Sequence, residues 1–145
     1  MSNIVIEQTT FLQKIVSDYG GVRRPWIGDT SNPLYKQYKF NTGIDVYGTN
    51  VYSYSSGVVL AVGKDKGKYA VTVQYDVFSV LRYTNIKDVA VSAGDMIQVG
   101  YKIGAAHNYV HFEYATKDQS NWPVRVGTET YYKQNPIRML GSVGA

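Results

Sequence analysis

The sequence predicts an all-β domain, either a sandwich or a barrel of short strands. Turn signals that contain glycine recur about every 8 to 15 residues along the chain. The apolar residues show no sustained spacing of about 3.6 residues, which an amphipathic helix requires. Residues 69–75 and 109–115 instead alternate with a period of two, as half-buried strands do. These observations favour strands over helices through most of the chain.

The first third of the chain carries few strand signals. Residues 3–17 are compatible with a short helix or a strand, and the pattern does not decide between them. Residues 18–21 include two adjacent glycines and predict a turn. Residues 24–34 contain two prolines among Gly, Asp, Ser and Asn residues, which predicts a loop.

Predicted strands begin with residues 58–62, an apolar run between Gly57 and Gly63 that is typical of a buried strand. The polar residues 64–68 predict a hairpin turn into a second strand at residues 69–75. Three further strands are predicted at residues 77–83, 96–103 and 108–115, with a turn at residues 92–95.

The last predicted strand carries polar side chains on one face. Its alternation places Tyr109, His111 and Glu113 on the same side. From Lys117 onward the chain is predicted to be loop-rich, because prolines interrupt it.

Composition excludes several classes of function. The length of 145 residues fits one domain. The net charge of +4 permits weak attraction to anionic polymers, but the basic residues are scattered and only Arg23 and Arg24 are adjacent. No specific nucleic-acid partner is therefore predicted. The chain has no cysteine, which excludes disulfides and thiolate chemistry.

No targeting segment or membrane span is predicted. Residues 1–10 carry Glu7 and lack the basic and apolar regions that mark a secretory signal. The chain also has no run of about 20 apolar residues, the length that a membrane-spanning helix needs.

The remaining candidate for chemistry is a metal or general-base site built from histidines and carboxylates. The chain has no GxSxG, P-loop, HExxH or dinucleotide-binding pattern. Its two histidines are His107 and His111. On a strand these positions are about 13 Å apart, too far to share a metal ion. His107 is therefore interpreted as an exposed loop residue.

Seven segments resemble, in the same order, those of the LytM/lysostaphin-type zinc peptidases, the M23 family. Residues 40–46 resemble the family's HxGxD segment, residues 81–86 its YaHL segment and residues 109–113 its HxHFe segment. The other matching segments are residues 17–25, 48–59, 91–104 and 135–136. The resemblance implies two antiparallel sheets in the LytM-type, or duplicated hybrid motif, fold. It also implies a single domain over residues 1–145 with its core at about residues 16–140.

The resemblance further implies which positions would carry the family's chemistry. The three zinc ligands of the family fall on Asn41, Asp45 and His111, and its two assisting histidines fall on Asn85 and Tyr109. Three of these five positions have changed from histidine. A catalytic zinc site needs three protein ligands and an open position, and an amide oxygen is a weak zinc donor compared with imidazole.

These departures predict a degenerate pseudo-peptidase with no catalytic residue and no cofactor, since the two retained ligands would hold zinc only weakly. Without zinc the bound water is not acidified, and no proton-transferring group is left. Asp45 and His111 are predicted to form a hydrogen-bonded remnant pair. Glu113 either orients His111 or faces solvent. Asn85, Tyr109 and Glu113 are candidates for lining a groove.

The resemblance therefore implies a non-catalytic M23-like module. We expect a structural component of a bacteriophage or prophage particle, in its tail or baseplate, or of a related envelope machine. The alternatives are a module that binds peptidoglycan or regulates a hydrolase, and an active zinc endopeptidase on cell-wall peptides. The expected partners are other virion or envelope proteins, or peptidoglycan, and self-association stays open. The expected location is the virion or the host cytoplasm.

Overall fold

A computed structural model describes residues 3–4, 15–17, 43–65, 67–136 and 139 of the chain. Every element in this part of the chain is a strand, which confirms the all-β prediction. The strands are β1 (Asn3–Ile4), β2 (Ile15–Ser17), β3 (Ile44–Tyr47), β4 (Asn50–Tyr52), β5 (Gly57–Asp65), β6 (Lys68–Asp76), β7 (Ser79–Val89), β8 (Met96–Ile97), β9 (Lys102–Thr116), β10 (Pro123–Val126) and β11 (Glu129–Gln134).

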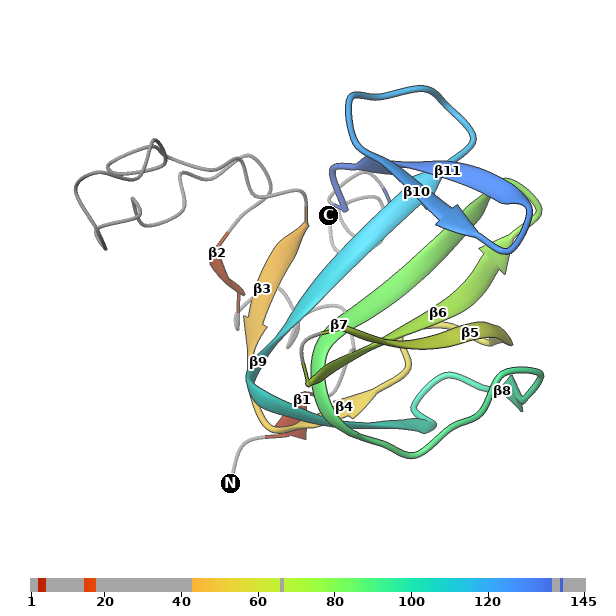
Figure 1. The fold of residues 1–145 in the computed structure, drawn as a ribbon. Coiled ribbons are helices and arrows are strands. Elements are labelled where there is room, and N and C mark those ends of the chain that lie inside the picture. Colours follow the sequence, from red (N-terminus) through yellow and green to blue (C-terminus); the bar gives the residue numbers. More distant parts are fainter. Residues whose placement is uncertain (1–2, 5–14, 18–42, 66, 137–138, 140–145) are drawn as a thin grey trace.

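The strands form one curled sheet around the long strand β9 (Figure 1). The main path runs β1-β4-β9-β7-β6-β5-β8, and every pair in the sheet is antiparallel except β1 with β4. Strands β3 and β11 also pair with β9, at different stretches of its 15 residues. The predicted antiparallel layers are therefore continuous with each other through β9.

Side-chain chemistry fixes the tight turns. In the β6–β7 hairpin, Asp76 Oδ1 accepts hydrogen bonds from the Phe78 N–H at 2.8 Å and from the Ser79 hydroxyl at 2.7 Å. An aspartate that bonds the backbone two residues on is a common way to stabilise a turn. In the β10–β11 hairpin, Gly127 has a φ of 62°, a conformation that glycine adopts at little cost.

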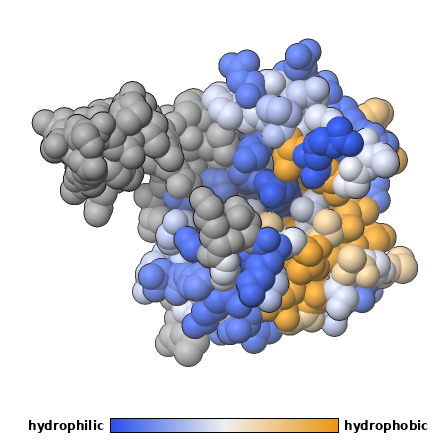
Figure 2. Space-filling view, viewed as in Figure 1, coloured by the Kyte–Doolittle hydropathy of each residue, from blue (hydrophilic) through white to orange (hydrophobic). Residues whose placement is uncertain are grey.

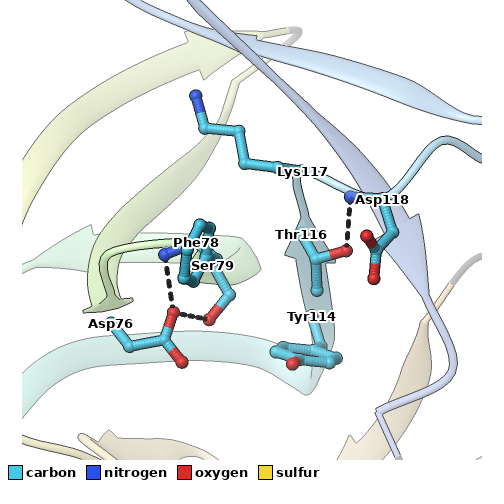
Figure 3. Close-up of a pocket in the computed structure, with 7 residues that line it drawn as sticks. All are labelled: Asp76, Phe78, Ser79, Tyr114, Thr116, Lys117 and Asp118. Carbon is cyan, nitrogen blue, oxygen red and sulfur yellow. Dashed lines mark hydrogen bonds between the residues drawn. The ribbon is translucent and has the colours of Figure 1, made fainter.

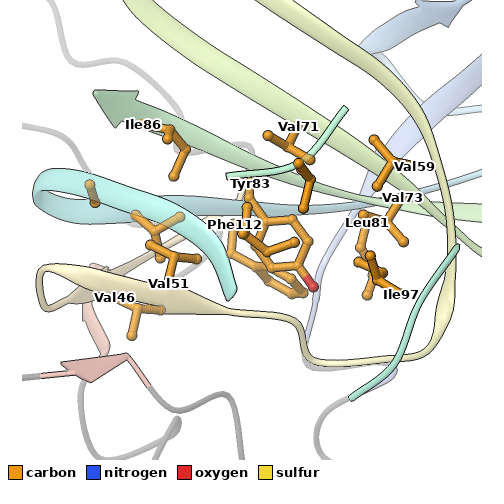
Figure 4. Close-up of a cluster of buried hydrophobic side chains, with 14 of the residues drawn as sticks. Val46, Val51, Val59, Val71, Val73, Leu81, Tyr83, Ile86, Ile97 and Phe112 are labelled. Atoms are coloured by element: carbon orange, nitrogen blue, oxygen red, sulfur yellow. The ribbon is translucent and has the colours of Figure 1, made fainter. Parts of the chain in front are cut away.

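The main core lies inside the curl, between β3 and β4 on one side and β5 to β7 on the other (Figure 4). Tyr83 and Phe112 fill its centre with fully buried rings whose centroids are 5.3 Å apart. The Tyr83 hydroxyl accepts a hydrogen bond from the Tyr54 N–H at 3.0 Å, and burial raises the pKa of Tyr83 to about 12.

A smaller apolar cluster lies on the opposite face of β7 and β9. Its buried members are Val80, Ala115 and Tyr131, with Val124 and Val126 of β10 packed against them. Because side chains alternate along a strand, this is the face that also carries His111 and Glu113. The β10–β11 hairpin thus borders the face of β9 on which the sequence predicted polar side chains.

Most predicted strands are present with changed boundaries. Residues 58–62, 69–75 and 108–115 lie within β5, β6 and β9, while β7 begins at Ser79 and continues to Val89. The predicted turn at residues 92–95 is confirmed, since Asp95 Oδ2 accepts a hydrogen bond from the Ser92 N–H at 2.8 Å.

Two predictions are wrong. The single strand predicted at residues 96–103 is instead β8 followed by a turn and the first two residues of β9, because the Tyr101 N–H bonds the Gln98 carbonyl at 3.0 Å. The loop-rich tail contains the β10–β11 hairpin, whose proline stands at the first residue of a strand, where proline is tolerated.

The predictions for the N-terminal third are largely untested. Residues 3–17 include the short strands β1 and β2, while the turn at residues 18–21 and the loop at residues 24–34 lie outside the described residues. Within the described part of the chain, no helix has the length and apolar character that crossing a membrane requires.

Candidate functional site

The pairing of β3 with β9 brings the predicted remnant pair together. Asp45 lies opposite His111 in the register, and Asp45 Oδ1 is 2.7 Å from His111 Nδ1. Gly43 permits this approach, because a Cβ there would lie 3.0 Å from His111 Cε1 and collide with the carbonyl oxygen of Phe112. The hydrogen-bonded pair that the sequence predicted is thus confirmed.

Glu113 completes the surroundings of the imidazole. Its Oε2 atom is 3.0 Å from His111 Nε2, so both ring nitrogens face a carboxylate. Arg82, which lies opposite Glu113 on β7, binds Glu113 Oε1, and Lys133 Nζ of β11 is 2.9 Å from Oε2. The alternative in which Glu113 faces solvent is wrong, because Glu113 is only 2% exposed.

We call these side chains the charge network: Asp45, Arg82, His111, Glu113 and Lys133. The sequence analysis did not select Arg82 or Lys133. Once Glu113 was placed on the polar face of a buried strand, a cationic partner was required, since buried carboxylates are almost always paired. The sequence offered no means to choose that partner from the 15 Lys and Arg residues.

The charge network shifts the pKa values of both Glu113 and His111. Burial alone would raise the pKa of Glu113, but the hydrogen bond from His111 and the positive charges of Arg82 and Lys133 lower it to about 2. Burial alone would lower the pKa of His111, but the hydrogen bonds to Asp45 and Glu113 outweigh it and raise that pKa. Both ring nitrogens can donate together only in the protonated imidazolium, which this arrangement therefore favours.

Asn85 is used to tie two strands together. The pairing of β7 with β9 shifts register around Asn85, whose φ of 66° is in the left-handed region. Its Nδ2 atom donates a hydrogen bond to the Tyr109 carbonyl at 2.7 Å. The Tyr109 side chain lies opposite Tyr47 of β3, next to the Asp45–His111 pair in the register.

Two remaining candidates have simple outcomes. His107 is exposed, as predicted, but it lies within strand β9 and not in a loop. Asn41, the third vestigial ligand position, lies outside the described residues.

Comparisons with known proteins rest on structure. No protein-family model matches the chain, and no curated protein sequence matches it. Among solved structures, the antimicrobial peptidase lysostaphin from Staphylococcus simulans is 22% identical with a TM-score of 0.63. The fold is that of the LytM/lysostaphin-type peptidases. The match covers 90% of this chain but 51% of lysostaphin, so this chain spans about half of that protein's length.

Two further structures share the LytM/lysostaphin-type fold. The catalytic domain of the prophage-encoded M23 protein EnpA from Enterococcus faecalis is 20% identical with a TM-score of 0.55, over 72% of this chain and 81% of that one. A chain of the SpoIIIAH–SpoIIQ complex is 21% identical with a TM-score of 0.59, over 86% and 90% of the two chains. The predicted fold resemblance is thereby confirmed.

Among the described residues, which leave out Asn41, the donors of the charge network are not arranged to hold the zinc ion that the LytM/lysostaphin-type fold implies. Within the described residues, no group of three or more His, Cys, Asp or Glu side chains is arranged to hold a metal. His111 has carboxylates at both nitrogens, and Glu113 is already compensated by Arg82 and Lys133. A zinc-bound histidine needs a free nitrogen lone pair, and nearby cations oppose the approach of a metal ion.

Proposed function

We propose that this chain is a non-catalytic module built on a peptidase fold. The observation that carries the proposal is the double engagement of His111, with Asp45 at 2.7 Å and Glu113 at 3.0 Å. For His111 to ligate zinc, the ring must lose a proton and one of these contacts. The positive charges of Arg82 and Lys133 keep Glu113 ionised, which stabilises its contact with His111. They therefore oppose the replacement of this contact by zinc.

The positions of the assisting histidines support the same proposal. Asn85 donates its amide to a backbone carbonyl, and the other position is Tyr109. Neither an amide nor a phenol exchanges protons readily near neutral pH, whereas peptide hydrolysis by a metal-bound water needs such a group.

Within this proposal, the favoured role is a structural component of a bacteriophage or prophage particle, or of a related envelope machine. The likeness to a prophage-encoded protein and to a chain of a two-protein complex supports it. Figure 2 shows apolar side chains gathered over β5 and β8. Met96 and Val99 near this region are 85% and 62% exposed, and such patches often mark protein contacts.

Binding to peptidoglycan is the second candidate, because two tyrosines stand beside the charge network. Tyr47 and Tyr109 are opposite each other on β3 and β9, and Tyr47 is 56% exposed. A tyrosine ring offers an apolar surface and a polar tip, which suits contact with a wall polymer.

Zinc titration with the purified chain tests the non-catalytic proposal. We expect a small fraction of a zinc ion per chain after dialysis, no rise in the melting temperature on adding zinc, and no release of peptides from cell walls. A ligand that binds only the native state raises the melting temperature. A zinc-dependent rise in the wild type and in His107→Ala that is lost in His111→Ala would contradict the proposal.

Sedimentation with purified peptidoglycan separates the two candidate roles. Binding that is reduced in Tyr47→Ala favours the wall-binding role. If the chain stays in the supernatant, the structural role is favoured. The control variant Tyr52→Ala shows whether loss of any tyrosine reduces binding.

A further inference from the structure

A pocket of about 400 Å³ opens where the β6–β7 hairpin meets the end of β9 (Figure 3). Its lining residues are Asp76, Phe78, Ser79, Tyr114, Thr116, Lys117 and Asp118. By strand alternation, Tyr114 and Thr116 lie on the face of β9 opposite to His111 and Glu113. The pocket is thus separate from the charge network, and its volume is in the range of small-molecule sites.

The uncompensated charge of this pocket is negative. Asp76 uses Oδ1 to hold its own hairpin, while Oδ2 accepts no hydrogen bond within the described chain. The hydrogen bonds of Asp118 with described residues use its backbone N–H and carbonyl, not its carboxylate. The ammonium of Lys117 is turned elsewhere, because it lies 2.7 Å from Glu129 Oε2 and 4.5 Å from the centroid of Tyr131. Two carboxylates therefore face a pocket in a protein whose net charge is +4.

Aromatic rings supply the rest of the wall. Figure 3 shows the Tyr114 ring at the bottom of the view, with Asp76 to its left and Asp118 above it. Tyr75 holds that ring in an edge-on contact, with centroids 6.3 Å apart. Phe78 is 66% exposed at the rim. Ring faces attract cations, so these rings and the carboxylates favour the same kind of ligand.

The acidic side of the pocket is also held in place. The Thr116 side chain is buried, and its hydroxyl oxygen accepts a hydrogen bond from the Asp118 N–H at 3.1 Å. Gln134 of β11 donates to the Asp118 carbonyl at 2.7 Å. The backbone of Asp118 is therefore fixed relative to the Tyr114 ring before any ligand arrives, which lowers the cost of binding.

We propose that this pocket binds a primary ammonium group, such as a basic side chain or a polyamine end. Asp76 and Asp118 are its carboxylate partners, and Tyr114 and Phe78 contact the ammonium and its alkyl chain. This assignment does not depend on whether the charge network is catalytic, because the two lie on opposite faces of β9.

A titration with 1,5-diaminopentane and with 1,5-pentanediol tests the proposal, because the two probes share length and differ in charge. Two-dimensional NMR of the full chain follows the backbone amides. We expect saturable shifts with the diamine, confined to residues 76–79 and 114–118, and none with the diol. Asp118→Asn is expected to weaken diamine binding at least about tenfold, the loss of one charge-assisted contact. Asp88→Asn removes an equal charge from an exposed site on β7 and should leave binding unchanged.

Three outcomes would overturn the assignment. Equal shifts with the diol would show that charge is not recognised. Diamine shifts that spread over the surface, or that weaken equally in Asp88→Asn, would show only a general attraction between charges. Unchanged binding by a folded Asp118→Asn variant would show that the Asp118 carboxylate is not a partner of the ammonium group.

Discussion

Glu113 is a buried carboxylate that contacts charged side chains of β7, β9 and β11. It contacts His111, Arg82 and Lys133, and its side chain is only 3% exposed. A carboxylate in such a place costs free energy to desolvate and is stabilised only by its partners. Removing its charge therefore takes away a carboxylate partner that Arg82, Lys133 and the His111 ring share.

We expect Glu113→Gln to lower the free energy of unfolding by about 3–5 kcal/mol, the usual effect of breaking a buried ion pair. Urea denaturation measures this change. The matched control is Glu129→Gln, which removes an exposed carboxylate from Lys117 and should leave the midpoint nearly unchanged. Similar midpoints for the two variants would show that the charge network adds nothing to stability.

Gly43 offers a second test at the residue scale. A methyl group at this position would press on the carbonyl oxygen of Phe112 and on the side chains of His111 and Glu113. We expect Gly43→Ala to destabilise the fold by about 1–3 kcal/mol, the usual cost of overpacking. The control is Gly63→Ala in β5, where nothing lies within 4 Å of the added Cβ. Equal denaturation midpoints for the two variants would contradict the tight contact between β3 and β9.

The residues of the charge network differ in how far the sequence could identify them. Asp45 and His111 stand in short segments that resemble the family's ligand motifs, so their pairing could be predicted. Arg82 and Lys133 lie 31 and 20 positions from Glu113 in the chain, and only the strand register brings them to it. Register depends on turns and bulges throughout the sheet, which local patterns do not fix.

At the scale of elements, strand β7 contains an irregularity next to the charge network. Its register with β9 shifts between Thr84 and Ile86, and Asn85 adopts a left-handed φ of 66° there. Asn tolerates this conformation better than most residues do, and its amide also bonds the Tyr109 carbonyl.

Two substitutions at Asn85 separate these contributions. Asn85→Gly keeps the left-handed conformation accessible and loses only the side-chain hydrogen bond, whose contribution is about 1 kcal/mol. Asn85→Ala loses the bond and must also adopt the left-handed conformation, which lowers the free energy of unfolding by about 1–2 kcal/mol more. Chemical denaturation should therefore rank the wild type above Asn85→Gly and Asn85→Ala last. A reversed order for the two variants would show that the backbone is not constrained at this position.

Strand predictions succeeded where alternation was long and failed where elements were short. Strands β6 and β9 alternate over many residues, so they were found. The β10–β11 hairpin contains a four-residue strand that begins with Pro123, a composition that does not predict a strand. The hairpin is held to the sheet by the pairing of β11 with β9, which the local sequence does not reveal. Strand β8 is two residues long, so a longer apolar pattern misled the prediction.

At the scale of the whole molecule, the two faces of β9 carry different groups of side chains. Strand β9 carries the charge network on one face and the Tyr114 pocket on the other, and β3, β7 and β11 supply partners along its length. Sequence patterns assigned one face of β9 correctly, but the pocket depends on where the β6–β7 hairpin ends relative to β9.

The stability of the whole molecule should depend on pH through the charge network. The folded pKa of Glu113 is about 2 against an ordinary value of 4.5, so the unfolded state binds its proton more readily between these values. Stability from Glu113 is therefore present above about pH 4.5 and is lost as pH falls toward 2, by about 3 kcal/mol in total. His111 acts in the opposite sense. Its raised pKa gives stability below its ordinary value of 6.5 that is lost as pH rises through the folded value.

Unfolding by urea from pH 2.5 to 8 measures both limbs. The wild type should be most stable between about pH 4.5 and 6.5, and Glu113→Gln should lose less stability than the wild type between pH 5 and pH 2.5. His111→Ala should flatten the alkaline limb, while His107→Ala, which changes an exposed histidine, should leave it unchanged. Parallel acid limbs in the wild type and Glu113→Gln would show that other carboxylates control the acid response and that Glu113 is not held ionised by its neighbours.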